Sequence, residues 1–152
     1  MPREEPVTIL SIERAYLVTP VCAQPMQVVR VGDGGYRVFV PGLAAILLSG
    51  YQHILVRPPL AEVLRDLCFD DMDFRPTAVR RVSTDETWQY VEVMPRFGLW
   101  LDTRDEREAW HYDFAHLFVS SVVRDALVER LPGELTFSPG FSSFGGVSAG
   151  QD

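Results

Sequence analysis

An internal duplication constrains the fold of this chain more than any other feature of its sequence. When the 152-residue sequence is shifted against itself by 63 residues, positions 53–76 align with positions 116–139 without a gap. Five positions are identical, whereas about one or two identities are expected by chance in such an alignment. The shared pattern of residue types strengthens the case for a duplication. The identical positions are His53 and His116, Val56 and Val119, Leu64 and Leu127, Phe74 and Phe137, and Pro76 and Pro139.

Each copy has the pattern of a strand followed by a helix and a second strand. It opens with an apolar run of the length of a buried strand, at residues 53–56 in the first copy and 116–119 in the second. Apolar residues spaced as on one face of a helix follow in both copies. They are Leu60, Val63, Leu64, Leu67 and Cys68 in the first copy and Val123, Ala126, Leu127 and Leu131 in the second, where Arg130 replaces Leu67.

The predicted helices begin differently but end in the same way. Pro58 and Pro59 suit a first helical turn, where no amide donor is needed, and Ser120 and Ser121 offer hydroxyl acceptors for the same amides. After a polar turn the chain returns as an extended segment in which apolar and polar residues alternate. The apolar residues of this return are Met72 and Phe74 in the first copy and Leu135 and Phe137 in the second.

Extended segments also predominate outside the two copies. A glycine-rich turn at residues 32–35 predicts a hairpin within residues 28–40, because glycine supplies the positive φ angles of tight turns. Residues 43–48 are apolar on every side, and periodicity does not separate a short buried helix from a strand there. Other strands are expected at 7–19, 78–82, 87–93 and 97–101, with a hairpin turn at 83–86 and a solvated turn or short helix at 102–108.

These patterns predict one α+β domain. A chain of 152 residues lies within the usual size range of a single domain and can bury a core without disulfides or metal. We expect a mixed or antiparallel sheet that contains the two strand–helix–strand units. The globular domain is expected to cover residues 1–140, and residues 141–152 are a Gly- and Ser-rich tail.

The charge balance favours a basic partner. Aspartate and glutamate total 21 against 14 basic residues, all of them arginine, which gives a formal net charge of -7. Such a protein repels nucleic acid overall and attracts basic proteins. We therefore expect a protein partner and no nucleic-acid partner.

No segment has the character of a membrane span or of a secretory signal. The longest apolar run, residues 42–48, is far too short to cross a bilayer, and residues 1–5 lack the basic-then-apolar order of a signal peptide. We expect a cytoplasmic protein with no membrane partner.

The two cysteines, Cys22 and Cys68, have no cysteine partner nearby in the sequence. Neither a disulfide framework nor a CxxC metal site is predicted, so we expect buried free thiols. Cys68 lies on the apolar helix face, where burial suppresses the reactive thiolate.

One group of residues could support catalysis or metal binding: His111, Asp113 and His116. On a strand His111 and Asp113 share a face that His116 opposes, so the three do not converge on one metal ion. The duplication pairs His116 with His53, which favours a structural role for both at the start of a strand. We expect no cofactor, and a small enzyme that uses these three residues is the least favoured alternative.

Asp70, Asp71 and Asp73 form the sharpest acidic cluster. The cluster lacks the later bidentate glutamate and the glycine of a calcium loop, so a solvated turn is favoured over a cation site. Contact with a basic partner is the functional alternative. Core packing is expected for most of the closely spaced aromatic residues, with one or two exposed as interface anchors. These aromatic residues are Trp88, Tyr90, Trp100, Trp110 and Tyr112.

The duplicated units resemble those of a known family. In the second copy His116-Leu117-Phe118-Val119-Ser120 precedes the helix and Phe137-Ser138-Pro139 follows it; the first copy has His53-Ile54-Leu55-Val56 and Phe74-Arg75-Pro76. This module resembles that of bacterial polymorphic-toxin immunity proteins and is similar to the repeated unit of the myxobacterial double-CxxCG paralogues. The CxxCG pairs are absent, because Cys22-Ala23-Gln24-Pro25 has one cysteine and no glycine, so no zinc role is carried over.

The resemblance implies an immunity protein that binds a cognate protein toxin and occludes it in the cytoplasm. The acidic charge balance fits a basic toxin surface. The interface candidates are acidic residues in predicted turns, where a partner could reach them: Asp70, Asp71, Asp73, Asp85 and Glu86. A structural or adaptor protein that forms homodimers through an exposed strand edge is the other alternative.

Overall fold

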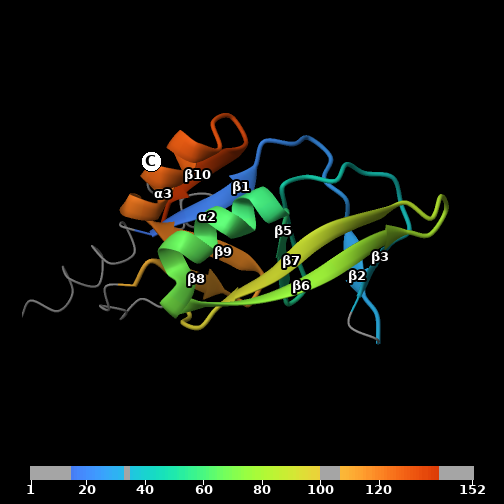
Figure 1. Ribbon diagram of the computed structural model, residues 1–152, viewed down its shortest axis with the longest axis horizontal. Coiled ribbons are helices and arrows are strands. Elements are labelled where there is room, and N and C mark those ends of the chain that lie inside the picture. Colours follow the sequence, from blue (N-terminus) through green and yellow to red (C-terminus); the bar gives the residue numbers. More distant parts are fainter. Residues whose placement is uncertain (1–14, 33–34, 100–106, 141–152) are drawn as a thin grey trace, which may run out of the picture.

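The computed structural model describes residues 15–32, 35–99 and 107–140 (Figure 1). Within these ranges ten strands form two sheets and two α-helices pack with them, which confirms the predicted α+β class. The larger sheet has the order β2-β3-β6-β7-β5-β4, and the smaller sheet has the order β10-β1-β9-β8. Every pair of neighbouring strands is antiparallel except β3 and β6, which are parallel.

Each sheet is built from strands that lie in separate parts of the sequence. The larger sheet contains β2 (Val28–Arg30), β3 (Tyr36–Val38), β4 (Leu47–Gly50), β5 (His53–Val56), β6 (Met72–Arg81) and β7 (Thr87–Pro95). The smaller sheet contains β1 (Ala15–Pro20), β8 (Ala109–Tyr112), β9 (His116–Ser120) and β10 (Leu135–Pro139). The helices are α2 (Pro58–Cys68), the short 3-10 helix η1 (Phe69–Asp71) and α3 (Ser121–Arg130).

Both predicted strand–helix–strand units are confirmed, as β5-α2-β6 and β9-α3-β10. In each unit one antiparallel strand lies between the two strands that flank the helix: β7 between β5 and β6, and β1 between β9 and β10. In each unit a hairpin strand, β4 or β8, also precedes the first strand. The order β6-β7-β5-β4 therefore repeats as β10-β1-β9-β8.

The helices form because their apolar stripes are buried. In α2 the buried residues are Leu60, Ala61, Val63, Leu64 and Cys68, and in α3 they are Val123 and Leu127. The start signals act as predicted: prolines occupy the first turn of α2, and the Ser120 hydroxyl accepts a hydrogen bond from the Val123 amide at 3.2 Å. The two helices contact each other and share one core with side chains of both sheets.

The side chains predicted to share a face of the return strands do pack together. Met72 is fully buried in the core under the helices, and Phe74, Leu135 and Phe137 pack against the same core. A second core covers the other face of the larger sheet and includes Tyr36, Leu55 and Tyr90. Both cysteines are free; Cys68 is buried as expected, whereas Cys22 is only half-buried.

The prediction of two strands between residues 72 and 82 is wrong, because β6 is one continuous strand of 10 residues. Pro76 lies inside β6, opposite Val91 of β7. On its other side β6 pairs with β3 only from Val79 onward, so this edge needs no amide donor from a proline. The β6–β7 hairpin extends to one end of the molecule (Figure 1).

The remaining strand predictions hold where the chain is described, except at residues 97–99, where no strand forms. The hairpins at 28–40 and 78–93 are present as β2–β3 and β6–β7, and the apolar segment 43–48 enters a strand, β4, rather than a helix. Gly98 makes one bridge to His111, so residues 97–99 lie beside β8 without forming a named strand. The predictions for residues 7–14, 100–106 and the 141–152 tail lie outside the described residues.

Candidate interaction site at two hairpin turns

The acidic residues predicted as an interface do not form one surface. Asp70 and Asp71 lie in η1 and Asp73 is near the start of β6, whereas Asp85 and Glu86 lie in the β6–β7 turn. Most of the 10-residue strand β6 separates the two groups. At about 3.3 Å per residue this places them roughly 30 Å apart.

The prediction that Asp71 lies in an exposed turn is wrong. Its side chain is buried, with 7% of the residue exposed. One carboxylate oxygen accepts the backbone amide of Glu108 at 2.7 Å, and the other lies 3.7 Å from the Arg107 guanidinium. Asp71 therefore satisfies a buried backbone donor and is not available to a partner.

The other predicted acidic residues are exposed, and most of them are paired with arginine. Asp73 forms an ion pair with Arg96 at 2.9 Å, Asp85 with Arg80, and Glu86 with Arg81 at 3.5 Å. The carboxylate of Asp70 has no ion pair among the described residues. Exposed pairs of this kind contribute about 0–1 kcal/mol, so they neutralise charge without contributing much stability.

Two hairpin turns, one from each unit, form the most distinctive surface of the described chain. The turn between β4 and β5 contains Tyr51 and Gln52, and the turn between β8 and β9 contains residues 113–115. Both turns line one shallow cavity of about 220 Å³. Its walls are Ser49, Gly50, Tyr51 and Gln52 from the first turn and Asp113, Ala115 and His116 from the second.

The backbone of these turns is held in a conformation that side chains disfavour. Gln52, Asp113 and Phe114 have φ angles of 58, 59 and 55 degrees, and among the described non-glycine residues only Asp85 is also positive. A left-handed residue other than glycine costs about 1–2 kcal/mol. Such conformations persist where the surroundings enforce them, and they cluster at functional sites.

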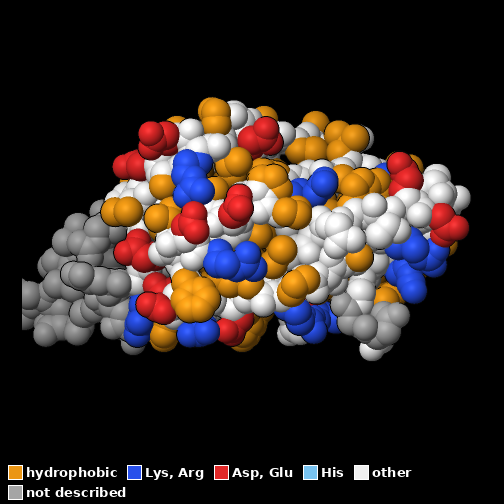
Figure 2. Space-filling view, in the orientation of Figure 1, with side chains coloured by type: hydrophobic (Ala, Val, Ile, Leu, Met, Phe, Trp, Pro, Cys, Tyr) orange, Lys and Arg blue, Asp and Glu red, His pale blue; other side chains and the backbone are white. Residues whose placement is uncertain are grey.

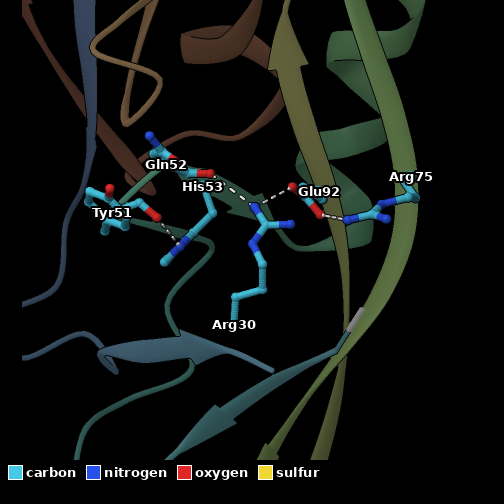
Figure 3. Close-up of polar contacts among 6 residues, drawn as sticks. All are labelled: Arg30, Tyr51, Gln52, His53, Arg75 and Glu92. Atoms are coloured by element: carbon cyan, nitrogen blue, oxygen red, sulfur yellow. Dashed lines mark hydrogen bonds and ion pairs between the residues drawn. The ribbon is translucent and has the colours of Figure 1, made fainter. Parts of the chain in front are cut away.

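An arginine–glutamate network enforces the β4–β5 turn from the larger sheet (Figure 3). Arg30 of β2 donates to the Gln52 carbonyl at 3.0 Å and pairs with the Glu92 carboxylate at 3.1 Å, and Arg75 of β6 binds the same carboxylate. Burial opposes ionisation of Glu92, but the bonds to Arg75 and the charge of Arg30 outweigh it and lower the Glu92 pKa. The network thus stays charged and ties β2, β6 and β7 to the turn.

His53 fills the space behind the same turn. Its Nδ1 lies 3.1 Å from the Tyr51 carbonyl, and its ring meets the edge of Tyr36 at 5.1 Å between centroids (Figure 3 shows the first contact). A Cβ atom on Gly50 would come within 2.8 Å of this ring, which explains the glycine. Burial lowers the pKa of His53 and, together with the charge of Glu92, raises the pKa of Tyr36 to about 12.

A second histidine enforces the β8–β9 turn. The Phe114 amide donates to Nδ1 of His111 at 3.2 Å, and the two rings stack at 4.3 Å. This bond requires Nδ1 without a proton, and burial lowers the pKa of His111 accordingly. The Ala115 amide closes the turn onto the Tyr112 carbonyl at 3.1 Å.

The three residues of the predicted catalytic alternative are separated by this arrangement. His111 is buried beneath the turn and does not line the cavity, whereas Asp113 and His116 do. Nδ1 of His116 lies 3.4 Å from the Tyr112 carbonyl, as Nδ1 of His53 lies near the Tyr51 carbonyl. The common role predicted for the duplicated histidines, at the start of a strand, is therefore present: both contact a carbonyl of their own hairpin.

The exposed aromatic residues of the two turns are not among the five closely spaced aromatic residues of which one or two were predicted to be exposed. Tyr90 and Trp110 are buried, Trp88 and Tyr112 are partly buried, and Trp100 lies outside the described residues. Instead Tyr51 is 84% exposed and Phe114 is 50% exposed, one on each turn. A signal was present, because the 63-residue shift that defines the duplication pairs Tyr51 with Phe114.

Neither a known relative nor a metal or membrane-spanning feature of the described residues points to a function. Comparisons of the chain with models of protein families, with curated proteins and with solved structures find no match. Within residues 15–32, 35–99 and 107–140, no three His, Cys, Asp or Glu side chains gather as a metal site would require. In the same ranges, neither helix is long and apolar enough to span a membrane.

Proposed function

We propose that this chain is an immunity protein that binds a cognate bacterial toxin in the cytoplasm and neutralises it by occlusion. The observation that carries the proposal is the pair of preformed hairpin turns that share one cavity. Each turn has an exposed aromatic residue: Tyr51 lines the cavity, and Phe114 stacks on His111 in the second turn. Aromatic residues are enriched among the few side chains that dominate protein–protein affinity. Turns that are already ordered lose little conformational entropy when a partner binds.

The duplicated units support the same proposal through their resemblance to toxin-immunity modules. They also explain why two similar turns come to lie together, since each unit contributes one hairpin to the cavity. Binding through equivalent turns of two related units needs no catalytic group. The separation of His111 from Asp113 and His116 favours binding over chemistry at this site.

The helical face supplies the long-range attraction that a basic toxin would feel. Figure 2 shows carboxylates spread over α2 and α3 with arginines among them. Asp66 and Asp125 are paired with arginines, whereas the exposed carboxylates of Glu62 and Glu129 have no ion pair among the described residues. With a net charge of -7, the protein would approach a basic surface faster than a neutral one would.

A tagged pull-down from the native organism, analysed by mass spectrometry, tests the proposal. We expect the wild-type chain to recover one toxin-domain protein and the Tyr51→Ala/Phe114→Ala variant to lose it. The matched control is Phe69→Ala, which removes another exposed aromatic residue, 65% exposed in η1 and outside the cavity. This control should recover the toxin at the wild-type level.

Two results would contradict the proposal. Recovery of only the chain itself would favour a homo-oligomeric structural or adaptor protein. Equal recovery of a toxin by the wild type and by the double variant would move the interface away from the turns. Circular dichroism of both variants checks that they remain folded.

A further inference from the structure

We propose that the cavity between the two hairpin turns receives a single arginine side chain of the partner protein. This inference rests on the proposed function, because it specifies the chemistry by which the toxin is recognised. Tyr51, Gln52, Asp113 and His116 are the residues that make the receptor.

The size of the cavity fits one side chain. Its volume is about 220 Å³. Pockets for drug-sized ligands usually measure about 300–1,000 Å³, so this cavity lies below their range. Tyr51, which is exposed, lines the cavity, and a recess beside an exposed aromatic residue is typical of one that accepts an anchor residue of a partner.

The charge of the cavity selects a cation. Asp113 is the one carboxylate among the lining residues, and no arginine lines the cavity. Asp73, Asp85 and Glu86 each have an arginine partner, whereas the Asp113 side chain makes no hydrogen bond or ion pair within the described chain. Asp113 is therefore an exposed carboxylate: its charge acts on His111, whose pKa burial nonetheless lowers, and its oxygens are open to a cation from outside.

The shape of the available groups favours arginine over lysine. A carboxylate accepts a guanidinium through two parallel hydrogen bonds, and the planar guanidinium also stacks on an aromatic face. Tyr51 offers such a face, being 84% exposed at the rim. The chain itself uses this contact, since the guanidinium of Arg107 lies 3.8 Å from the ring centroid of Phe97.

The geometry of the receptor is set before the partner arrives. Gln52 and Asp113 are both held at positive φ, by the Arg30–Glu92–Arg75 network on one side and by the His111–Phe114 contact on the other. The carboxylate and the aromatic ring come from different units, so their spacing depends on the packing of the whole molecule. The turns therefore lose little conformational entropy when the arginine side chain binds.

A titration with small probes tests the receptor without the toxin. The full chain, labelled with 15N, is titrated with N-acetyl-arginine amide, and N-acetyl-citrulline amide serves as the uncharged isostere. We expect amide shifts confined to residues 49–53 and 111–116, and binding of citrulline weaker by about tenfold or more. Equal binding of the two probes, or shifts that map elsewhere, would overturn the inference.

Asp113→Asn is the informative variant, because asparagine tolerates the left-handed conformation as aspartate does and the turn should stay intact. We expect it to weaken binding of the arginine probe by about tenfold. Asp85→Asn, which changes the fourth positive-φ residue at the far end of the β6–β7 hairpin, should bind as the wild type does. An unchanged affinity in Asp113→Asn, with a well-dispersed spectrum, would contradict the receptor.

The outcome separates this inference from the proposed function. A toxin captured equally by the wild type and by Asp113→Asn would overturn the arginine receptor and leave the immunity proposal standing. Probe binding that depends on Asp113, without any captured toxin, would support the receptor and count against the immunity proposal.

Discussion

Histidine side chains support both hairpin turns from inside the protein. His53 lies behind the β4–β5 turn and His111 lies beneath the β8–β9 turn, with exposed fractions of 3% and 7%. In each case burial is the largest influence on the imidazole and lowers its pKa below the ordinary 6.5. A neutral ring at both positions is therefore part of the folded structure, and protonation is coupled to its stability.

We predict that acidification destabilises the protein through these two residues. Between the lowered folded-state pKa and 6.5, the unfolded chain binds protons that the folded chain excludes. The contribution is fully present above 6.5 and is lost as the pH falls toward the folded-state pKa values. Urea unfolding at about pH 7.5 and about pH 5.5 measures the difference across the range in which histidine titrates.

The control for this prediction is the His53→Gln/His111→Gln variant. It should be less stable than the wild type at the higher pH and should lose less stability on acidification. The prediction would be wrong if the variant and the wild type lost the same free energy of unfolding over this range, because other groups would then carry the pH dependence.

At the scale of elements, the two units are alike in topology over more elements than the sequence alignment covers. The aligned copies contain a strand, a helix and a strand, but the repeated unit has a fourth and a fifth element, the hairpin strand and the intervening antiparallel strand. In the first unit the intervening strand is β7, which follows β6 in the chain. In the second unit it is β1, from the other end of the described chain.

This arrangement explains which parts of the fold could be predicted. The order and bounds of the elements in the two units could be predicted, because local sequence patterns mark them. These patterns are the apolar stripe from Leu60 to Cys68 in α2 and the serine at the start of α3. The place of β1 between β9 and β10 could not be predicted, because β1 precedes its unit in the chain whereas β7 follows β6, so the constant shift that aligns the units does not align these two strands. Long-range strand pairing depends on contacts that periodicity does not record.

The candidate site was predictable only in part, for a related reason. Acidic turn residues were chosen by charge, but Asp71 turns inward to the Glu108 amide and β6 separates the remaining residues into two groups. Tyr51 and Phe114 lie next to the aligned segments and match at the same shift. The cavity that the two turns share arises from packing of one unit against the other, which sequence patterns do not specify.

We predict that Gly50→Ala damages the β4–β5 hairpin. The new Cβ would lie 2.8 Å from Cε1 and Nε2 of the His53 ring, which is buried and cannot move without disturbing Tyr36. Overpacking of this kind costs about 1–3 kcal/mol, and the variant should also lose affinity for the partner because the turn moves. Thermal and urea unfolding measure the loss of stability.

Gly32→Ala is the matched control for this element. A Cβ atom at Gly32 would meet nothing within 4 Å, so the change should stay within about 0.5 kcal/mol of the wild type. If both alanine variants were as stable as the wild type, the contact between Gly50 and His53 would not be what fixes the turn.

At the scale of the whole molecule, the two units together form one cavity that neither forms alone. Each unit supplies a hairpin with an exposed aromatic residue, and the packing of α2 against α3 in a common core brings the units together. On the helices, Glu62 and Glu129 have no ion pair among the described residues, and the two turns share the preformed cavity. Under the proposed function, the acidic charge would attract a basic partner and the turns would make the specific contact.

The most direct test of this account is the affinity of the captured toxin for the wild-type chain and for the Tyr51→Ala and Phe114→Ala variants, measured by calorimetry. Anchors of this kind contribute about 2 kcal/mol or more each, so we predict at least about 30-fold weaker binding for each single variant. Phe69→Ala should bind as the wild type does. Wild-type affinity in both turn variants, with their folds intact, would contradict the central claim that the paired hairpin turns are the binding site.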